Sequence, residues 1–118
     1  MTIATLQTHF IPEDLQNLED DGLYELVDGK LVEKEMSELA NRTVTRVSFH
    51  VFSHIDAPRL GELYTEQTYR CFPAAPGRVR RPDLSFISAA RLSLVPGKGH
   101  STVRPDLAIE VLSPNDVV

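Results

Sequence analysis

Near its C-terminus the chain reads Arg104-Pro105-Asp106-Leu107-Ala108-Ile109-Glu110-Val111-Leu112-Ser113-Pro114-Asn115-Asp116. Residues 107–112 are apolar and partly β-branched except at Glu110, which predicts a strand that carries one carboxylate among apolar neighbours. Such a carboxylate destabilises a buried strand unless a metal ion or a cationic group compensates its charge. A second acidic residue, Asp83, opens the apolar run 84–87 upstream. These two carboxylates decide the fold and the site that we expect.

Antiparallel pairing of strands 83–88 and 107–112 would bring Asp83 beside Glu110, because the start of one strand then lies beside the end of the other. Carboxylates, a backbone carbonyl and water are the ligands that Mg²⁺ and Mn²⁺ prefer. We therefore expect a metal site formed by Asp83, Glu110 and the backbone of Val111. A Pro-Asp pair at a strand entrance is also common turn chemistry, so both interpretations of Asp83 stay open.

Asp106 is not expected to join this site. It lies four residues before Glu110, which is roughly 13 Å along a strand and too far to share one ion. The same antiparallel pairing leaves Asp106 near Ser88, where we expect it to cap backbone amides of its turn.

The rest of the chain predicts two helices and a hairpin in addition to the strands. Asp28-Gly29 between two alternating apolar runs predicts a hairpin over residues 24–34. Apolar residues at helical spacing predict one long helix over residues 37–57, with Ser37 as its N-cap. We expect the hairpin and this helix to pack against the same sheet. Weaker patterns predict a helix at 12–20, strands at 62–66 and 68–72, and a helical turn at 89–92.

Composition limits the possible functions. The chain has 118 residues, 42% of them hydrophobic, and a net charge of −5, so no global basic field attracts nucleic acid. The local cluster Arg78, Arg80 and Arg81 could contact DNA phosphates, form a solvated edge, or pair with the acidic residues. The single Cys71, expected to be a buried inert thiol, fits a reducing cytoplasm. No apolar run is long enough for a membrane span, and no leader-like segment is expected.

One further pair of residues could bind metal. His50 and His54 stand four residues apart on the long predicted helix, as in zinc-binding helices. Exposed helix residues without a ligand are the alternative that we favour.

Three motifs in order resemble the PD-(D/E)XK nuclease superfamily and, within it, the bacterial Uma-type family described as putative restriction endonucleases. The motifs are residues 24–33, 80–86 and 105–114, and the match runs from about residue 22 to the end. The resemblance implies an α/β (α+β) restriction-endonuclease-like core with a mixed sheet, an N-terminal hairpin and one long helix. Residues 1–21 would form a helical lead-in and residues 22–118 the domain.

The resemblance also implies a function and its residues. It assigns Asp83 to the Pro-Asp position, Glu110 to the second acidic position, and Glu25 to an assisting acidic position. It implies a Mg²⁺- or Mn²⁺-dependent hydrolase, an endonuclease that cleaves DNA phosphodiester bonds in the cytoplasm.

A lysine completes the site of the superfamily, and this chain departs from that pattern. The lysine would stand two residues after Glu110, where the chain has Leu112, or in a helix following residues 113–116. We expect none of the three lysines, Lys30, Lys34 and Lys98, at the site.

The final helix and strands of the family would lie beyond Val118. We therefore expect an incomplete domain with little or no nuclease activity. The alternative is a non-catalytic oligomerisation or binding module, in which an exposed sheet edge and apolar surface would favour a homodimer.

Overall fold

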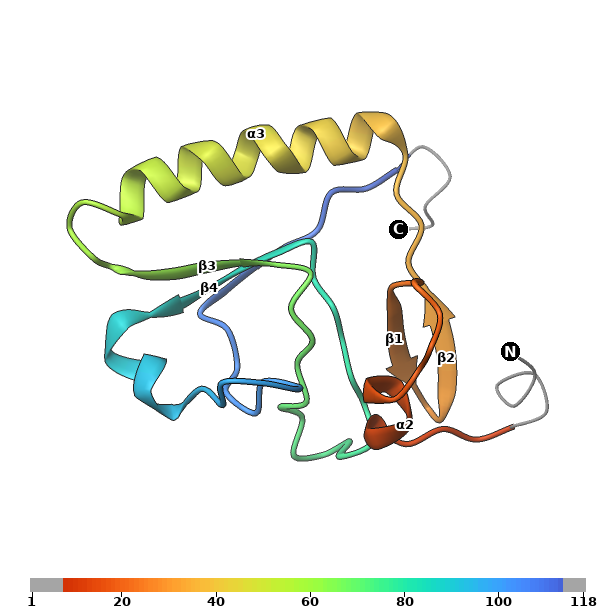
Figure 1. Ribbon diagram of the computed structural model, residues 1–118. Coiled ribbons are helices and arrows are strands. Elements are labelled where there is room, and N and C mark those ends of the chain that lie inside the picture. The colour runs from red at the N-terminus through yellow and green to blue at the C-terminus, as the bar shows by residue number, and fades with distance from the viewer. Residues whose placement is uncertain (1–7, 114–118) are drawn as a thin grey trace.

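Two small sheets and one long helix form the computed structural model, which describes residues 8–113 (Figure 1). The sheets are the hairpin β1–β2 and a sheet of order β3-β4-β5, and every neighbouring pair is antiparallel. The predicted α+β class is thus confirmed. The elements are α2 (Pro12–Gln16), β1 (Tyr24–Val27), β2 (Lys30–Glu33), α3 (Glu38–Ile55), β3 (Gly61–Thr65), β4 (Leu84–Ser88), the 3₁₀ helix η1 (Ala89–Leu94) and β5 (Leu107–Ile109).

The hairpin turns at Asp28-Gly29, as predicted. Asp28 has φ 53° and Gly29 has φ 78°, the left-handed values that a two-residue hairpin turn requires at both positions. The register pairs Leu26 with Leu31 and Val27 with Lys30. This register places Lys34 directly after the end of β2.

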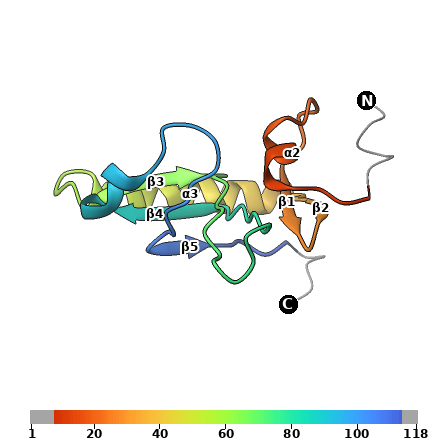
Figure 2. The same ribbon diagram turned by 90° about the horizontal axis from the view of Figure 1, so that it is seen from below.

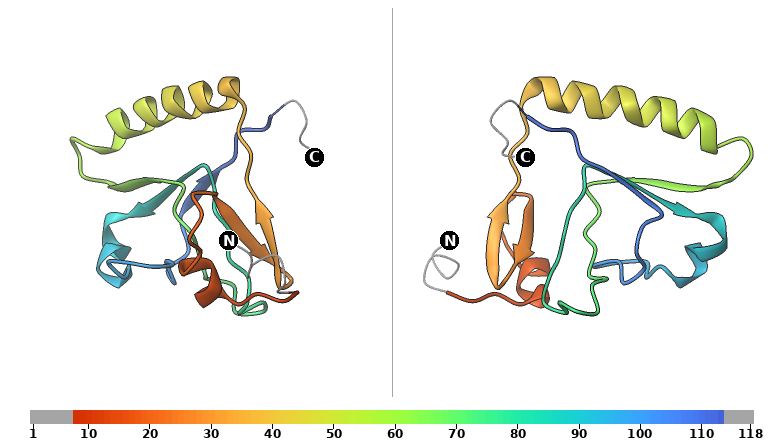
Figure 3. Two further views of the ribbon diagram at one scale, coloured as in Figure 1. Left: turned by 45° about the vertical axis from the view of Figure 1, so that its right-hand side comes forward. Right: turned by 180° about the vertical axis from the view of Figure 1, so that it is seen from behind.

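The expected packing of the hairpin against the long helix and its sheet is wrong. Leu26 is fully buried in a cluster with Phe10, Leu15 and Val79. Leu26 and Val79 exchange backbone hydrogen bonds of 2.7 and 2.9 Å, which tie the hairpin to the chain just before β4. Figures 1 and 3 show the hairpin beside α2, below the start of α3. The boundary drawn at residue 21 stays a prediction, although α2 and β1 share this cluster.

Helix α3 packs along the β3-β4-β5 sheet and matches its prediction closely. Ser37 caps it, since the Ser37 hydroxyl accepts a hydrogen bond of 3.1 Å from the amide of Ala40. Ala40, Val44 and Ile55 are its buried residues. Three large apolar side chains of α3 are exposed: Leu39, Phe49 and Phe52. No helix within residues 8–113 is long and apolar enough to cross a membrane.

Several element predictions need correction. The strand expected at 68–72 is absent, because Tyr69 makes only isolated bridges, to Arg80 and Ser101, while its ring is buried against Ile87 and Val103. Helix α2 ends at Gln16 rather than residue 20, and β5 ends at Ile109 rather than residue 112. The radius of gyration of 15.2 Å exceeds the roughly 13.5 Å expected for this length, because the hairpin and the larger sheet do not stack on each other.

The predicted pairing of the last two strands is confirmed. Leu84 pairs with Ile109 and Phe86 with Leu107, so the antiparallel register brings residues 83 and 110 to the same end of the sheet. Figure 2, which views the molecule from below, shows β3, β4 and β5 side by side in front of α3. Asp106 lies at the other end, where it accepts a hydrogen bond of 2.7 Å from the Ser88 amide, as predicted. The helix start expected at 113–116 lies mostly outside the described residues.

Candidate functional site

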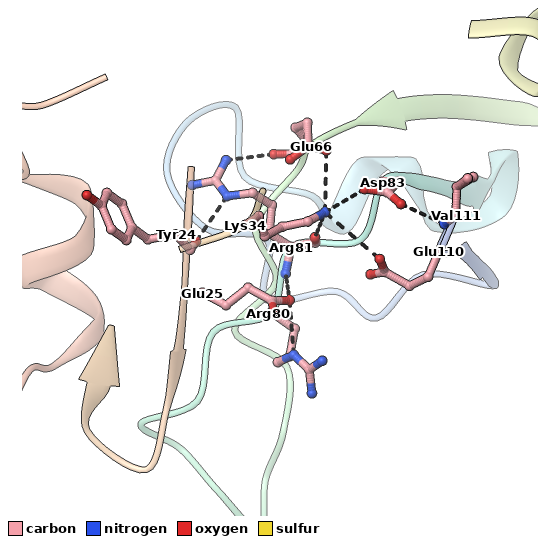
Figure 4. Close-up of polar contacts among 9 residues, drawn as sticks. All are labelled: Tyr24, Glu25, Lys34, Glu66, Arg80, Arg81, Asp83, Glu110 and Val111. Carbon is pink, nitrogen blue, oxygen red and sulfur yellow. Dashed lines mark hydrogen bonds and ion pairs between the residues drawn. The ribbon is translucent and has the colours of Figure 1, made fainter. Parts of the chain in front are cut away.

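Asp83 stands immediately before β4 and is buried, with 2% of its surface exposed. Its Oδ2 accepts a hydrogen bond of 2.7 Å from the backbone amide of Val111, across the strand pair. Its Oδ1 accepts a hydrogen bond of 2.7 Å from the ammonium of Lys34 (Figure 4). These contacts reach across the sheet and to the hairpin, so Asp83 does more than cap its own turn.

Lys34 lies at the centre of the site, which corrects the expectation that no lysine reaches it. Its Nζ is 2.6 Å from the carbonyl oxygen of Arg81, 2.7 Å from Asp83 Oδ1 and 4.0 Å from Glu110 Oε2. Burial lowers the pKa of this ammonium, but the hydrogen bond to Asp83 and the neighbouring carboxylate charges outweigh it, so the pKa is raised. Sequence reasoning missed Lys34 because tertiary contacts bring the hairpin to the site: Leu26 pairs with Val79, and Glu25 binds Arg80 and Arg81.

Glu110 follows β5 and turns toward the same ammonium. The distances of Asp83 and Glu110 to Lys34 Nζ, 2.7 and 4.0 Å, place their carboxylate oxygens no farther apart than the sum of the two. The predicted convergence, to within about 10 Å, is therefore confirmed. Burial, opposed by Lys34 and aided by the charges of Asp83 and Glu25, raises the pKa of Glu110 to about 7.

The expectation that Glu110 sits inside a buried strand is wrong. Strand β5 covers only Leu107–Ile109 and is largely exposed, because it is the edge of its sheet. The Glu110 side chain keeps 50% of its surface exposed. An exposed carboxylate beside a buried one can reach solvent and a ligand at once.

Glu66, which the sequence did not single out, adds a third carboxylate. It follows β3, and its Oε1 lies 3.4 Å from Lys34 Nζ. Its Oε2 is buried and has no hydrogen-bond partner within residues 8–113. Burial, opposed by Lys34, raises the pKa of this carboxyl. No periodicity or motif marks Glu66, because it stands in a loop that only the fold brings to the site.

Glu25 lies at the border of the site and holds the segment that precedes Asp83. Only 9% of its surface is exposed, and its Oε2 accepts hydrogen bonds from Arg80 Nε at 3.0 Å and from the Arg81 amide at 2.8 Å. Glu25 therefore touches the backbone of the Pro-Asp motif and does not contact Lys34. Its assigned assisting role stays a prediction.

Arg78, Arg80 and Arg81, which could contact DNA, form a solvated edge or pair with acidic residues, have different surroundings in the structure. Arg81 donates to the carbonyls of Tyr24 and Glu66 at 3.0 and 2.9 Å, and Arg80 pairs with Glu25. Arg78 lies over the Phe72 ring, 5.7 Å from its centroid. Arg81 is thus a structural link, while Arg80 keeps 48% of its side-chain surface exposed.

A cavity of about 430 Å³ opens beside the carboxylates. Its lining is mostly apolar, and its four charged residues are Glu25, Glu110, Arg80 and Arg104. Cys71 also borders it and is half-buried, and burial raises the pKa of its thiol. Carboxylate and guanidinium side chains are the groups that bind a cation and a phosphate, respectively.

The residues present fit a hard divalent cation by chemistry. Carboxylate and carbonyl oxygens surround one point, and the buried Glu66 Oε2 lacks a partner. Within residues 8–113, no group of three or more His, Cys, Asp or Glu side chains is already arranged to hold a metal ion. Water would therefore have to complete the ligand set. His50 and His54 are both exposed on α3, as favoured.

Comparison with known proteins assigns the chain to a family. The profile of the Uma2 family, described as "Putative restriction endonuclease", matches residues 12–117. The chain belongs to the Uma2 family. A crystal structure of a nuclease described as putative and belonging to DUF820, from Anabaena variabilis, superposes with a TM-score of 0.68 at 22% identity. The match covers 89% of this Uma2 chain and 59% of that chain, and it shows a shared fold. No curated protein matches.

Proposed function

We propose that this Uma2 chain is part of a metal-dependent endonuclease that hydrolyses DNA phosphodiester bonds, with Asp83 and Glu110 as metal-binding carboxylates. The observation that carries the proposal is the convergence of these carboxylates, from the start of β4 and the end of β5, on one cation position. The description of the Uma2 family and that of the DUF820 neighbour support it. Because the chain spans 59% of that neighbour's length, the activity of a whole protein belongs to the proposal too.

A bound Mg²⁺ or Mn²⁺ supplies two things to such a reaction: a lower pKa for a bound water and stabilisation of charge on the phosphate. The residues of the chain prepare the site for that chemistry. The Val111 amide fixes Asp83 from one side, and Glu25 fixes the backbone of Arg81 two residues before Asp83. The Val111 carbonyl as a metal ligand stays a prediction.

Substrate contact in this proposal is made by guanidinium groups that bind phosphate. Arg80 and Arg104 both line the cavity, as does Glu110. Of the arginine cluster predicted to bind DNA, Arg80 is the best placed, because Arg81 is occupied by backbone carbonyls and Arg78 by an aromatic ring. Phosphate contacts of this kind position a nucleic acid without reading its sequence.

Plasmid nicking tests the proposal. We expect the chain to nick supercoiled plasmid with Mg²⁺ or Mn²⁺ and to lose this activity in EDTA and in the Glu110→Gln variant. The Glu110 side chain is half-exposed, so this substitution leaves the fold intact. Glu62→Gln, an exposed glutamate on β3, is the matched control and should retain activity. The sequence predicted little or no activity for two reasons: no lysine was expected at the site, and the family's final helix and strands were expected beyond Val118. Lys34 removes the first reason.

Failure to nick under both metals would contradict the proposal. The alternative function, a non-catalytic oligomerisation or binding module, has one observation in its favour. Helix α3 exposes Leu39, Phe49 and Phe52, with 56%, 67% and 49% of their surfaces accessible. Absence of cleavage together with a dimer in light scattering after size exclusion would favour that alternative.

A further inference from the structure

The Lys34 ammonium is held as a bound cation would be. Its three acceptors are the Arg81 carbonyl at 2.6 Å, Asp83 Oδ1 at 2.7 Å and Glu66 Oε1 at 3.4 Å, and Glu110 Oε2 stands at 4.0 Å. An ammonium has three donors and no acceptor, so this set satisfies all of its protons. The Lys34 side chain is only 14% exposed. Its charge therefore sits inside an oxygen cage rather than in solvent.

The cage is composed of the oxygens that a hard divalent cation selects. Carboxylate and carbonyl oxygens are the common protein ligands of Mg²⁺ and Mn²⁺. A divalent ion and the ammonium cannot share these oxygens, since two cations at the spacing of contacting ligands repel each other strongly in a partly buried site. Binding of a divalent ion to Asp83 and binding of the ammonium to Asp83 Oδ1 are thus alternatives.

Glu66 shows that the ammonium leaves the cage incompletely satisfied. Three carboxylates, those of Asp83, Glu66 and Glu110, face this one ammonium. Glu66 Oε2 is buried and has no partner in the part of the chain described, and a buried unpaired oxygen is costly. The Glu66 backbone has φ 56°, a left-handed value that non-glycine residues adopt rarely and that gathers at functional sites. An ion with more than one charge would compensate this cage better than Lys34 does.

We propose that Lys34 is an internal competitor of the metal, and that a divalent ion enters the site by displacing its ammonium and recruiting Glu66 as a third carboxylate. This inference rests on the proposed function for the metal site and names two residues, Lys34 and Glu66, that the family resemblance does not assign. The displaced ammonium stays tethered at the end of β2.

Calorimetric titration with MnCl₂ tests the competition directly. We expect Lys34→Met to bind Mn²⁺ about tenfold or more tightly than the unmodified chain, because one positive charge leaves the cage. Lys30→Met is the matched control, since Lys30 is an exposed lysine at the start of β2, the strand that Lys34 follows. The affinity of this variant should equal that of the unmodified chain. Glu66→Gln in the Lys34→Met background should weaken Mn²⁺ binding again. Circular dichroism confirms that each variant is folded.

A second measurement uses the unmodified chain and needs no variant. Brief acetylation with acetic anhydride, read by mass spectrometry, should modify Lys34 more slowly than the exposed Lys30 and Lys98. Saturating Mn²⁺ should raise the modification of Lys34 and leave the other two lysines unchanged.

The outcomes separate this inference from the proposed function. Equal or weaker Mn²⁺ binding by Lys34→Met, or acetylation of Lys34 that Mn²⁺ does not raise, overturns the competition. If Asp83→Asn still abolishes Mn²⁺ binding in that case, the metal site of the proposed function survives. Absence of Mn²⁺ binding in every variant, Lys34→Met included, overturns both.

Discussion

Replacing Asp83 by asparagine should destabilise the fold strongly, independent of any activity. Asp83 and Lys34 have side chains 3% and 14% exposed, and at 2.7 Å their gross attraction is about 6 kcal/mol at an effective dielectric constant of 20. Desolvation offsets much of this attraction, and removing one partner of a buried pair costs about 3–5 kcal/mol. Lys34 retains the Arg81 carbonyl and Glu66, so we expect about 2–3 kcal/mol for Asp83→Asn. The asparagine also has a single acceptor oxygen for Lys34 and the Val111 amide.

Urea unfolding followed by circular dichroism measures this loss. With a slope of about 1–3 kcal/mol/M, a loss of about 2–3 kcal/mol should lower the midpoint by about 0.7–3 M. Lys34→Met and the double variant complete a cycle in which the double variant is less destabilised than the sum of the singles, by about 1–2 kcal/mol. Asp106→Asn, at the exposed far end of the same strand pair, should shift the midpoint less. Additive effects, or a midpoint for Asp83→Asn equal to that of Asp106→Asn, would refute the buried ion pair.

Two further predictions concern residues outside the carboxylate cluster. Gly29→Ala should lower the free energy of unfolding by about 1 kcal/mol or more, because Gly29 has φ 78° and a Cβ there would clash with the His9 ring. Thermal melting checks this, and Gly77→Ala, with open space around it, is the control. Cys71 should react with iodoacetamide at pH 8 more slowly than free cysteine does, because burial raises the pKa of its thiol and only the thiolate form reacts. The rate for Cys71 should continue to rise at higher pH. A rate equal to that of free cysteine would contradict this prediction.

Local patterns in the sequence predicted the hairpin, the long helix, three strands and two of the carboxylates, but not the irregular path of residues 68–72. Asp28-Gly29 determined the hairpin turn, because few residue pairs tolerate two left-handed positions in succession. Ser37 and the apolar spacing after it determined where α3 begins. The apolar runs after Asp83 and Asp106 predicted β4 and β5, and the assumed antiparallel pairing of these strands predicted that Asp83 and Glu110 share an end of the sheet.

Only the tertiary structure decided what surrounds those carboxylates. Lys34 and Glu66 lie 49 and 17 positions before Asp83 in the sequence, and neither belongs to a motif. Lys34 reaches the site because Leu26 pairs with Val79, and Glu66 because β3 pairs with β4. Those pairings follow from burial of Leu26 and Leu84 in the folded chain. A sequence pattern records the spacing of residues along one helix or strand. The charges that meet at one point depend instead on how separate elements pack. Here that packing placed the Lys34 ammonium among the carboxylates of Glu66, Asp83 and Glu110.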